Sequence, residues 1–256
     1  MNDNSIFDEV LELLMKNKQF PYYAAERRLD IFINFFLEDM LTAYYENREV
    51  KFVAPEFPLK HEQNNQADKL DYLCVFKKTS QPIFVELKTD SISFKESQCE
   101  YYLKKANNWK ACMEDLIDVT KNRNTSSSYR LKYYSLVMRL HESGLVSLSQ
   151  NAVRLSTQID TLIDCDSQSD KGKRSRLIRT LCSENMSVDA RKEARVIYLA
   201  PPLKYDDQKY LKNKDVDLID LSQLSVFSGN VKPEYRPEFE HFAEILQNHF
   251  RLPQKD

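Results

Sequence analysis

Two carboxylates and one lysine are spaced along the chain so that they could act together on a phosphate. Asp71 is followed, after 14 intervening residues, by Glu86 and then Lys88. Side chains alternate between the two faces of a strand, so Glu86 and Lys88 emerge on the same face. If the chain forms a hairpin that closes near Thr79, Asp71 lies within a residue or two of being opposite them, with Cβ atoms roughly 5 to 8 Å apart. Two acids and one ammonium group therefore converge.

This combination suits phosphodiester hydrolysis. Carboxylate oxygens such as those of Asp71 and Glu86 are hard ligands that bind Mg²⁺ or Mn²⁺, and the ion lowers the pKa of a bound water and neutralises charge on the phosphate. Lys88 would orient the water or stabilise the developing negative charge. The alternative interpretation of the same three residues is an ion pair on an edge strand, which protects the strand against aggregation.

The elements that must position these residues are a hairpin and a following helix. The runs 72–76 and 83–87 are β-type segments separated by a polar turn with a proline, which predicts the hairpin. A capping box, Ser93 to Glu96, predicts that a helix starts near residue 94 and continues to about 119.

The predicted helix carries Gln98 and Tyr102 four residues apart, so these side chains are neighbours on one face. One interpretation of the pair is a solvated surface glutamine beside a packed tyrosine. Trp109, farther along the same face, is interpreted as a core residue.

An aspartate, 14 residues and Glu-x-Lys at a strand end, followed by a helix with Gln-x-x-x-Tyr, resembles the PD-(D/E)XK nuclease superfamily and, in its helix, the RecB-type exonuclease branch. Leu70 stands where the family name has proline. The resemblance covers roughly residues 24–119 and 195–221. It implies an α/β fold with a restriction-endonuclease-like core, in which a central mixed β-sheet is flanked by helices, and catalytic roles for the matching residues, which are Asp71, Glu86, Lys88, Gln98 and Tyr102.

A sixth candidate lies on a helix predicted from residue 24 to about 45. Glu26 projects onto the apolar stripe of this helix, either because the helix dipole favours an acid in the first turn or because it faces a cation. Members of the superfamily carry an acidic residue on the helix before the hairpin, which implies Glu26 near the metal, with Glu38 as the alternative. Glu56, in the extended run 50–60, faces either the cleft or water.

The remaining chain predicts one domain over residues 1–256 with a helical insertion over 120–194. A first helix is expected over 4–17, insertion helices over 129–142 and from 145 to about 163, and a last helix over 237–250. Two later segments read as core strands, 195–201, which is apolar and closed by prolines, and 215–221.

The insertion contains the densest basic cluster of a near-neutral chain. Five basic residues stand among nine with no acid, which indicates either a solvated helix face or a phosphate contact; they are Lys171, Lys173, Arg174, Arg176 and Arg179.

Composition narrows the functional classes. The net charge of −2 argues against a protein that coats nucleic acid nonspecifically. There is no Gly-rich phosphate loop, no C-x-x-C pair and no apolar run long enough for a membrane span. The five cysteines without close pairing, and the amino terminus without a basic n-region, indicate a cytoplasmic protein without a membrane segment.

The sequence therefore predicts a nuclease that depends on Mg²⁺ or Mn²⁺, held by Asp71 and Glu86, with DNA as the expected substrate and RNA as the other possibility. A catalytically inactive module of the same fold, used for nucleic-acid or protein binding, is the alternative.

Overall fold

The computed structural model describes residues 25–60, 67–122, 125–165, 167–184, 186–188 and 193–251. The helix predicted over 4–17 lies outside these ranges. The elements follow in the order α2 (Ala25–Tyr44), β1 (Val50–Lys60), β2 (Ala67–Phe76), β3 (Pro82–Leu87), α3 (Glu96–Asn107), α4 (Trp109–Lys121), α5 (Ser127–Glu142), β4 (Val146–Leu148), α6 (Gln150–Asp160), α7 (Gln168–Ser183), β5 (Met186–Val188), β6 (Arg195–Ala200), α8 (Tyr205–Asn213), β7 (Asp217–Asp220), the 3₁₀ segments η1 (Leu221–Asn230) and η2 (Pro233–Tyr235), and α9 (Arg236–Arg251).

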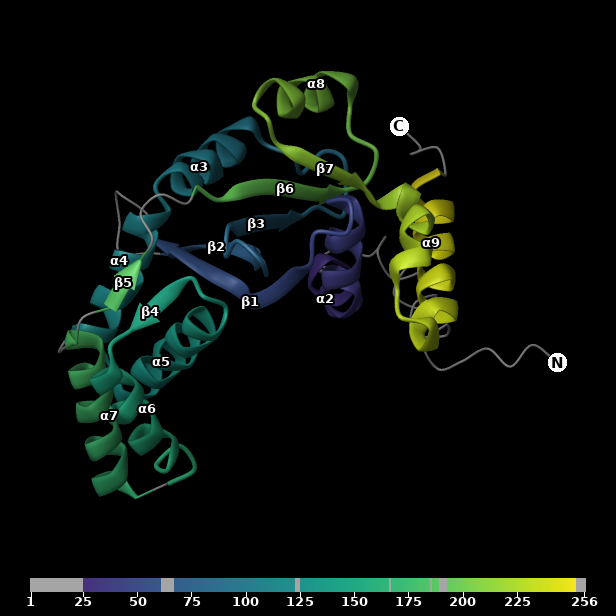
Figure 1. The fold of residues 1–256 in the computed structure, drawn as a ribbon. Helices are drawn as coiled ribbons and strands as arrows, with labels where there is room; N and C mark the ends of the chain where they lie inside the picture. The colour runs from purple at the N-terminus through teal and green to yellow at the C-terminus, as the bar shows by residue number, and fades with distance from the viewer. Residues whose placement is uncertain are drawn as a thin grey trace.

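A mixed sheet with the strand order β1-β2-β3-β6-β7 forms the centre of the molecule. The first three strands are antiparallel, whereas β6 runs parallel to β3 and β7 parallel to β6. Helices lie on both sides of the sheet, with α2 and α9 on one side and α3 and α4 on the other (Figure 1). The prediction of an α/β fold with a central mixed sheet flanked by helices is confirmed.

Alternation along the hairpin divides the core in two. Tyr72 pairs with Val85, and both pack with α2 and α9. Phe84, one residue along β3, packs instead against Trp109 of α4, with ring centroids 6.0 Å apart. Glu86 shares the face of Phe84, so it points to the side of the sheet that α3 and α4 cover. Trp109 is a core residue, as predicted.

β1 tolerates two prolines because it is the edge strand of the sheet, where a missing N–H breaks no ladder on the open side. Glu56, between Pro55 and Pro58, has a φ of 44° and forms an ion pair of 2.8 Å with Lys69. Both side chains are more than half exposed. Of the two alternatives for Glu56, the structure favours the solvated one.

The single helix predicted from 94 to about 119 is wrong. Asn108, with φ −122° and ψ 47°, separates α3 from α4. The predicted capping box is also wrong, because Ser93 is bonded to Asp90 and the N-cap of α3 is Lys95, which makes no side-chain cap. Asp90 competes for Ser93 because Asp and Ser side chains readily bond to nearby backbone groups.

The segment between α4 and β6 forms a lobe of α5, α6 and α7 beside the sheet (Figure 1). The helix predicted from 145 to about 163 begins only at Gln150, because Val146–Leu148 pairs with Met186–Val188 as a two-stranded sheet. Ser149 then caps α6 by accepting from the amide of Ala152. The lobe has a small core of its own, which includes Tyr134, Ile159 and Leu181.

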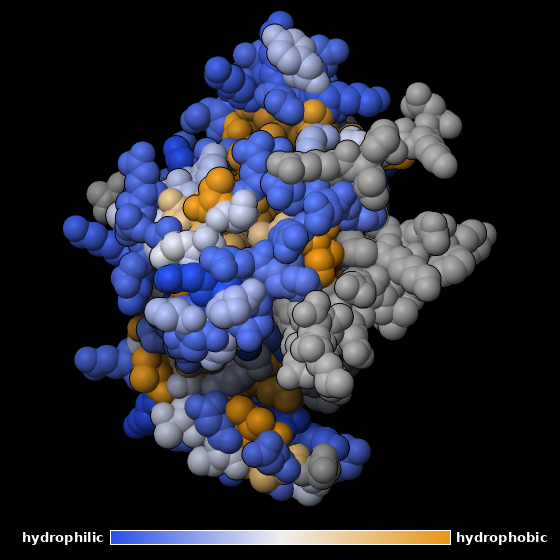
Figure 2. Space-filling model, turned by 90° about the vertical axis from the view of Figure 1, so that its right-hand side faces the viewer, coloured by the Kyte–Doolittle hydropathy of each residue, from blue (hydrophilic) through white to orange (hydrophobic). Residues whose placement is uncertain are grey.

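The surface is mainly hydrophilic on the face shown in Figure 2, where hydrophobic side chains stand in separate small patches. None of the helices in the described ranges combines the length and the apolar composition that crossing a bilayer requires. The apolar side of α2, which includes Leu29, Ile33 and Leu37, is instead buried against the sheet.

Candidate metal and phosphate site

Asp71, Glu86 and Lys88 meet where β3 ends. The paired register of the hairpin ends with Tyr72 opposite Val85, and one further step along both strands brings Asp71 opposite Glu86. Lys88 follows directly after β3 and donates its backbone N–H to the carbonyl of Leu199 on β6, 2.8 Å away. The two strands and the parallel neighbour thus place the predicted triad at one end of the sheet, as the sequence indicates.

Glu86 and Lys88 form a buried ion pair. Only 3% of Glu86 and 7% of Lys88 are exposed, and Lys88 Nζ lies 2.7 Å from Glu86 Oε1. The interpretation as a surface edge-strand pair is therefore wrong, since β3 is a central strand and both side chains are buried. Burying two charges costs desolvation energy that their attraction often does not fully offset.

The second oxygen of Glu86 makes the site unusual. Oε1 accepts from Lys88 and from Gln98 Nε2 at 2.8 Å, whereas buried Oε2 has no hydrogen-bond partner within the described part of the chain. A buried carboxylate oxygen normally has a partner, so this one requires an explanation. A cation or a water held beside Oε2 would provide the missing partner.

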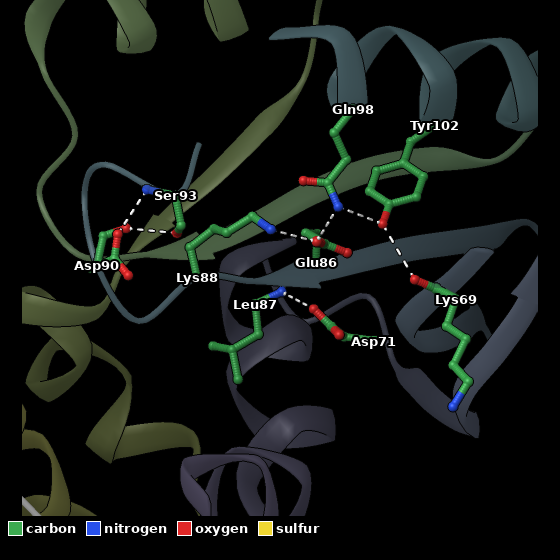
Figure 3. Close-up of polar contacts among 9 residues, drawn as sticks. All are labelled: Lys69, Asp71, Glu86, Leu87, Lys88, Asp90, Ser93, Gln98 and Tyr102. Atoms are coloured by element: carbon green, nitrogen blue, oxygen red, sulfur yellow. Dashed lines mark hydrogen bonds and ion pairs between the residues drawn. The ribbon is translucent and has the colours of Figure 1, made fainter. Parts of the chain in front are cut away.

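Asp71 is held next to this carboxylate by the backbone of β3. Its Oδ2 accepts from the N–H of Leu87 at 2.6 Å, which fixes the side chain at the end of the hairpin away from the turn. Figure 3 shows Asp71 pointing to Leu87 on the strand that carries Glu86. Two acidic groups of neighbouring strands thereby share one end of the sheet.

Gln98 and Tyr102 on α3 support Glu86 from above the sheet. Gln98 Nε2 donates both to Glu86 Oε1 and to the hydroxyl of Tyr102 at 3.0 Å, and that hydroxyl donates to the carbonyl of Lys69 at 3.3 Å (Figure 3). Burial raises the pKa of Tyr102, and the nearby negative charge of Glu86 raises it further. Tyr102 is therefore a neutral hydrogen-bonding group, and Gln98 is a positioning residue rather than a solvated surface glutamine.

The donor set fits a small divalent cation. Within the described ranges no group of three or more His, Cys, Asp or Glu side chains is arranged as a metal site. Mg²⁺ nevertheless keeps several waters and is commonly held by one or two carboxylates together with substrate phosphates. Asp71 and Glu86 are the two residues that would hold it, and Oε2 of Glu86 is buried without a hydrogen-bond partner in the described part of the chain.

Of the two acidic residues predicted on the preceding helix, only Glu38 has a side chain that the structure describes. Glu26 lies in α2, but its side chain is outside what the structure describes. Glu38, the alternative, accepts from the N–H of Phe52 at 2.7 Å. That bond anchors α2 to the edge strand β1, which gives Glu38 a structural role.

The basic run lies on α7, at the far end of the lobe from the end of β3 (Figure 1). Lys173 and Arg176 are exposed, and Lys171 and Arg179 are half-buried. Arg174 is buried and donates to the carbonyls of Leu162 and Ile163. These bonds connect α7 to the turn after α6. The guanidinium of Arg174 is therefore used within the fold, and we do not propose that it contacts phosphate.

A loop beside the triad was missed by the sequence interpretation. Asp90, Ile92, Ser93 and Lys95 line a cavity together with Lys88 and Gln98. The spacing of Asp90 and Ser93 is a signal for an Asx turn, and it was obscured because Ser93 also matches a helix cap. One member of the triad, Lys88, therefore lines a cavity that the sequence did not predict.

No family model matches this chain, and no curated protein or solved structure is significantly similar to it, so the interpretation of the site rests on its residues and their geometry.

Proposed function

We propose that this protein is a nuclease that depends on Mg²⁺ or Mn²⁺ and hydrolyses phosphodiester bonds, with DNA as the expected substrate and RNA as the alternative. The observation that carries the proposal is the buried carboxylate of Glu86, whose Oε2 has no partner in the described structure although Asp71 and Lys88 lie beside it. The five cysteines are free thiols, which suits the reducing cytoplasm that we propose as its location.

When bound, the cation would supply Lewis-acid chemistry, lowering the pKa of a water and neutralising phosphate charge. Asp71 and Glu86 would hold it at the end of the sheet. Lys88 contributes a fixed positive charge that can stabilise negative charge on the phosphate or orient the attacking water. Gln98 and Tyr102 keep Glu86 in one rotamer, which preserves the direction of Oε2.

The test is thermal unfolding with and without Mg²⁺ or Mn²⁺, together with cleavage of labelled DNA. A ligand at one hundred times its Kd stabilises the native state by about 2.7 kcal/mol. For a chain of this length that corresponds to a rise in Tm of roughly 5 to 10 °C. The rise should disappear in Glu86→Gln and Asp71→Asn, which remove a negative charge and keep the size of the side chain.

The matched control is Glu114→Gln, which neutralises an exposed glutamate of α4 that pairs with Lys110. This variant should keep the full rise in Tm. Equal rises in all four proteins would exclude Asp71 and Glu86 as the ligands, whatever the cleavage assay shows.

A catalytically inactive module is the second candidate, and the Lys88–Glu86 contact favours it. At 2.7 Å the ammonium already occupies one carboxylate oxygen, so Glu86 has a partner even without a cation. Such a module would bind nucleic acid or protein without hydrolysis. DNA binding by a wild-type protein that cleaves neither DNA nor RNA in the presence of Mn²⁺ would support it.

We further propose that α7 contacts nucleic-acid phosphates through Lys173 and Arg176. Replacing both with Ala should weaken DNA binding and reduce the salt slope of log K by about 1.8, because each phosphate contact contributes about 0.9 to the slope for duplex DNA. Fluorescence anisotropy over a salt series measures this. Lys212→Ala, which changes an exposed lysine of α8, is the control. An unchanged salt slope in the double variant would indicate that these residues of α7 form a solvated helix face without phosphate contacts.

A further inference from the structure

A cavity adjoins the triad and is open to ligand. It has a volume of about 550 Å³, within the range of roughly 300 to 1,000 Å³ that is usual for small-molecule sites. Two of its lining residues, Lys88 and Gln98, belong to the candidate metal and phosphate site, and Ile92 and Lys95 lie on the loop before α3. The cavity is therefore continuous with the place where a scissile phosphate would lie.

The loop that forms the outer wall is fixed by its own hydrogen bonds. Asp90 Oδ1 accepts from the amides of Ile92 at 3.1 Å and Ser93 at 2.7 Å, and Ser93 Oγ donates to the carbonyl of Asp90 at 3.0 Å (Figure 3). This turn presents Ile92 with 76% of its surface exposed. A single exposed isoleucine is common, but this one stands in a fixed turn beside two lysines that line the same cavity.

Two lysines and one aspartate line the cavity, and Oδ1 of that aspartate, Asp90, already accepts from two amides of its own turn. Lys95 is the N-cap of α3, where a positive side chain is opposed by the helix dipole rather than stabilised by it. Glu96 in the first turn offsets part of this charge. Lys88 adds a second ammonium to the lining, where it is paired with Glu86 Oε1 at 2.7 Å. An anionic group in the cavity would be stabilised chiefly by Lys95, because the charge of Lys88 is already offset by Glu86.

We propose that this cavity binds the phosphate next to the scissile one, so that the substrate is a polynucleotide strand which runs from Asp71 and Glu86 across the start of α3. This inference rests on the nuclease function proposed above. Lys95 contacts the neighbouring phosphate, and Ile92 contacts the sugar or base attached to it. A diester with a single phosphate fills only the position at the triad and gains nothing from Lys95.

The experiment compares a fluorescein-labelled oligonucleotide with bis(p-nitrophenyl) phosphate, a diester with one phosphate, in the presence of Mn²⁺. Lys95→Ala should raise KM for the oligonucleotide about tenfold, as expected for one charge-assisted contact, and leave kcat and the small diester unchanged. Lys95→Arg should restore KM. Ile92→Ala should raise KM for the oligonucleotide alone. Lys78→Ala, an exposed lysine in the turn at the other end of the hairpin, is the control.

Each outcome separates this inference from the proposed function. If Lys95→Ala cleaves both substrates as the wild type does, the phosphate position is excluded while the nuclease remains. An equal loss on both substrates would assign Lys95 to the chemistry or the fold and would also overturn the inference. If the wild type cleaves neither substrate, the nuclease proposal fails. Oligonucleotide binding, measured by anisotropy, then tests the phosphate position at the cavity. Weaker binding by Lys95→Ala but not by Lys78→Ala then supports the cavity as a phosphate site, and equal binding refutes it.

Discussion

Replacement of Lys88 by methionine should abolish most of the cleavage activity while metal binding survives. The substitution removes the ammonium group and keeps a long apolar side chain in the buried position beside Glu86. Loss of one preorganised electrostatic contact typically lowers kcat on the order of 10²- to 10³-fold, or roughly 3 to 4 kcal/mol in the activation free energy. The measurement is the single-turnover rate on labelled linear and circular DNA and on RNA with Mn²⁺.

Two controls make this result specific. Lys110→Met, in an exposed lysine of α4, should leave the rate unchanged. The metal-induced rise in Tm should persist in Lys88→Met, because Asp71 and Glu86 remain in place. Activity that persists in both Lys88→Met and Asp71→Asn would point to a contaminating nuclease and would remove Lys88 from the proposed chemistry. Cleavage of linear but not circular DNA by the wild type would indicate an exonuclease.

The arrangement of the triad was predictable from sequence because it depends on local rules. The period of two along residues 83–87 assigns Glu86 to the face of Phe84, and the short turn near Thr79 limits the register of the hairpin to within a residue or two. The apolar stripe of α2 and the closing prolines after β6 identify those elements in the same way. Strand β6 was therefore recognisable although its partner β3 is distant in sequence.

The predictions that were wrong concern residues whose structure depends on competing local hydrogen bonds or on partners distant in sequence. Ser93 satisfies the pattern of a helix cap, yet its amide and its hydroxyl both donate to Asp90. The periodicity of the sequence does not indicate whether Ser93 caps the helix or bonds to Asp90. Val146–Leu148 is too short to be recognised as a strand and owes its conformation to Met186–Val188. Arg174 stands in a basic run that suggests exposure, but its burial depends on how α7 packs on α6.

The burial of Glu86 and Lys88 was also not predictable, and it leads to an expectation about stability. Glu86→Leu leaves the Lys88 ammonium buried without its carboxylate, and Lys88→Met removes the charged partner of Glu86 and keeps its hydrogen bond from Gln98. Breaking a buried ion pair by removing one partner typically costs about 3 to 5 kcal/mol. Each single variant should therefore lose that amount in the free energy of unfolding, measured by urea denaturation at neutral pH.

The double variant Glu86→Leu/Lys88→Met should behave in the opposite way. Replacing both partners of a buried pair by apolar groups is often neutral, or stabilising by roughly 1 to 4 kcal/mol, because the desolvation cost of both charges disappears. We expect the double variant to be about as stable as the wild type, yet inactive and without the metal-induced rise in Tm. The exposed ion pair Lys110–Glu114 of α4 provides the control set of single and double variants. Glu114→Leu, Lys110→Met and their combination should each change the free energy of unfolding by less than about 1 kcal/mol.

This cycle distinguishes a functional pair from a structural one. If the pair contributes net stability to the fold, the double variant will be less stable than the wild type. If they serve the chemistry, the fold gains or keeps stability when both charges are removed, and only activity and metal binding disappear. Oε2 of Glu86 has no partner among the residues that the structure describes, which favours the second outcome, since a carboxylate placed only for stability would have both of its oxygens satisfied.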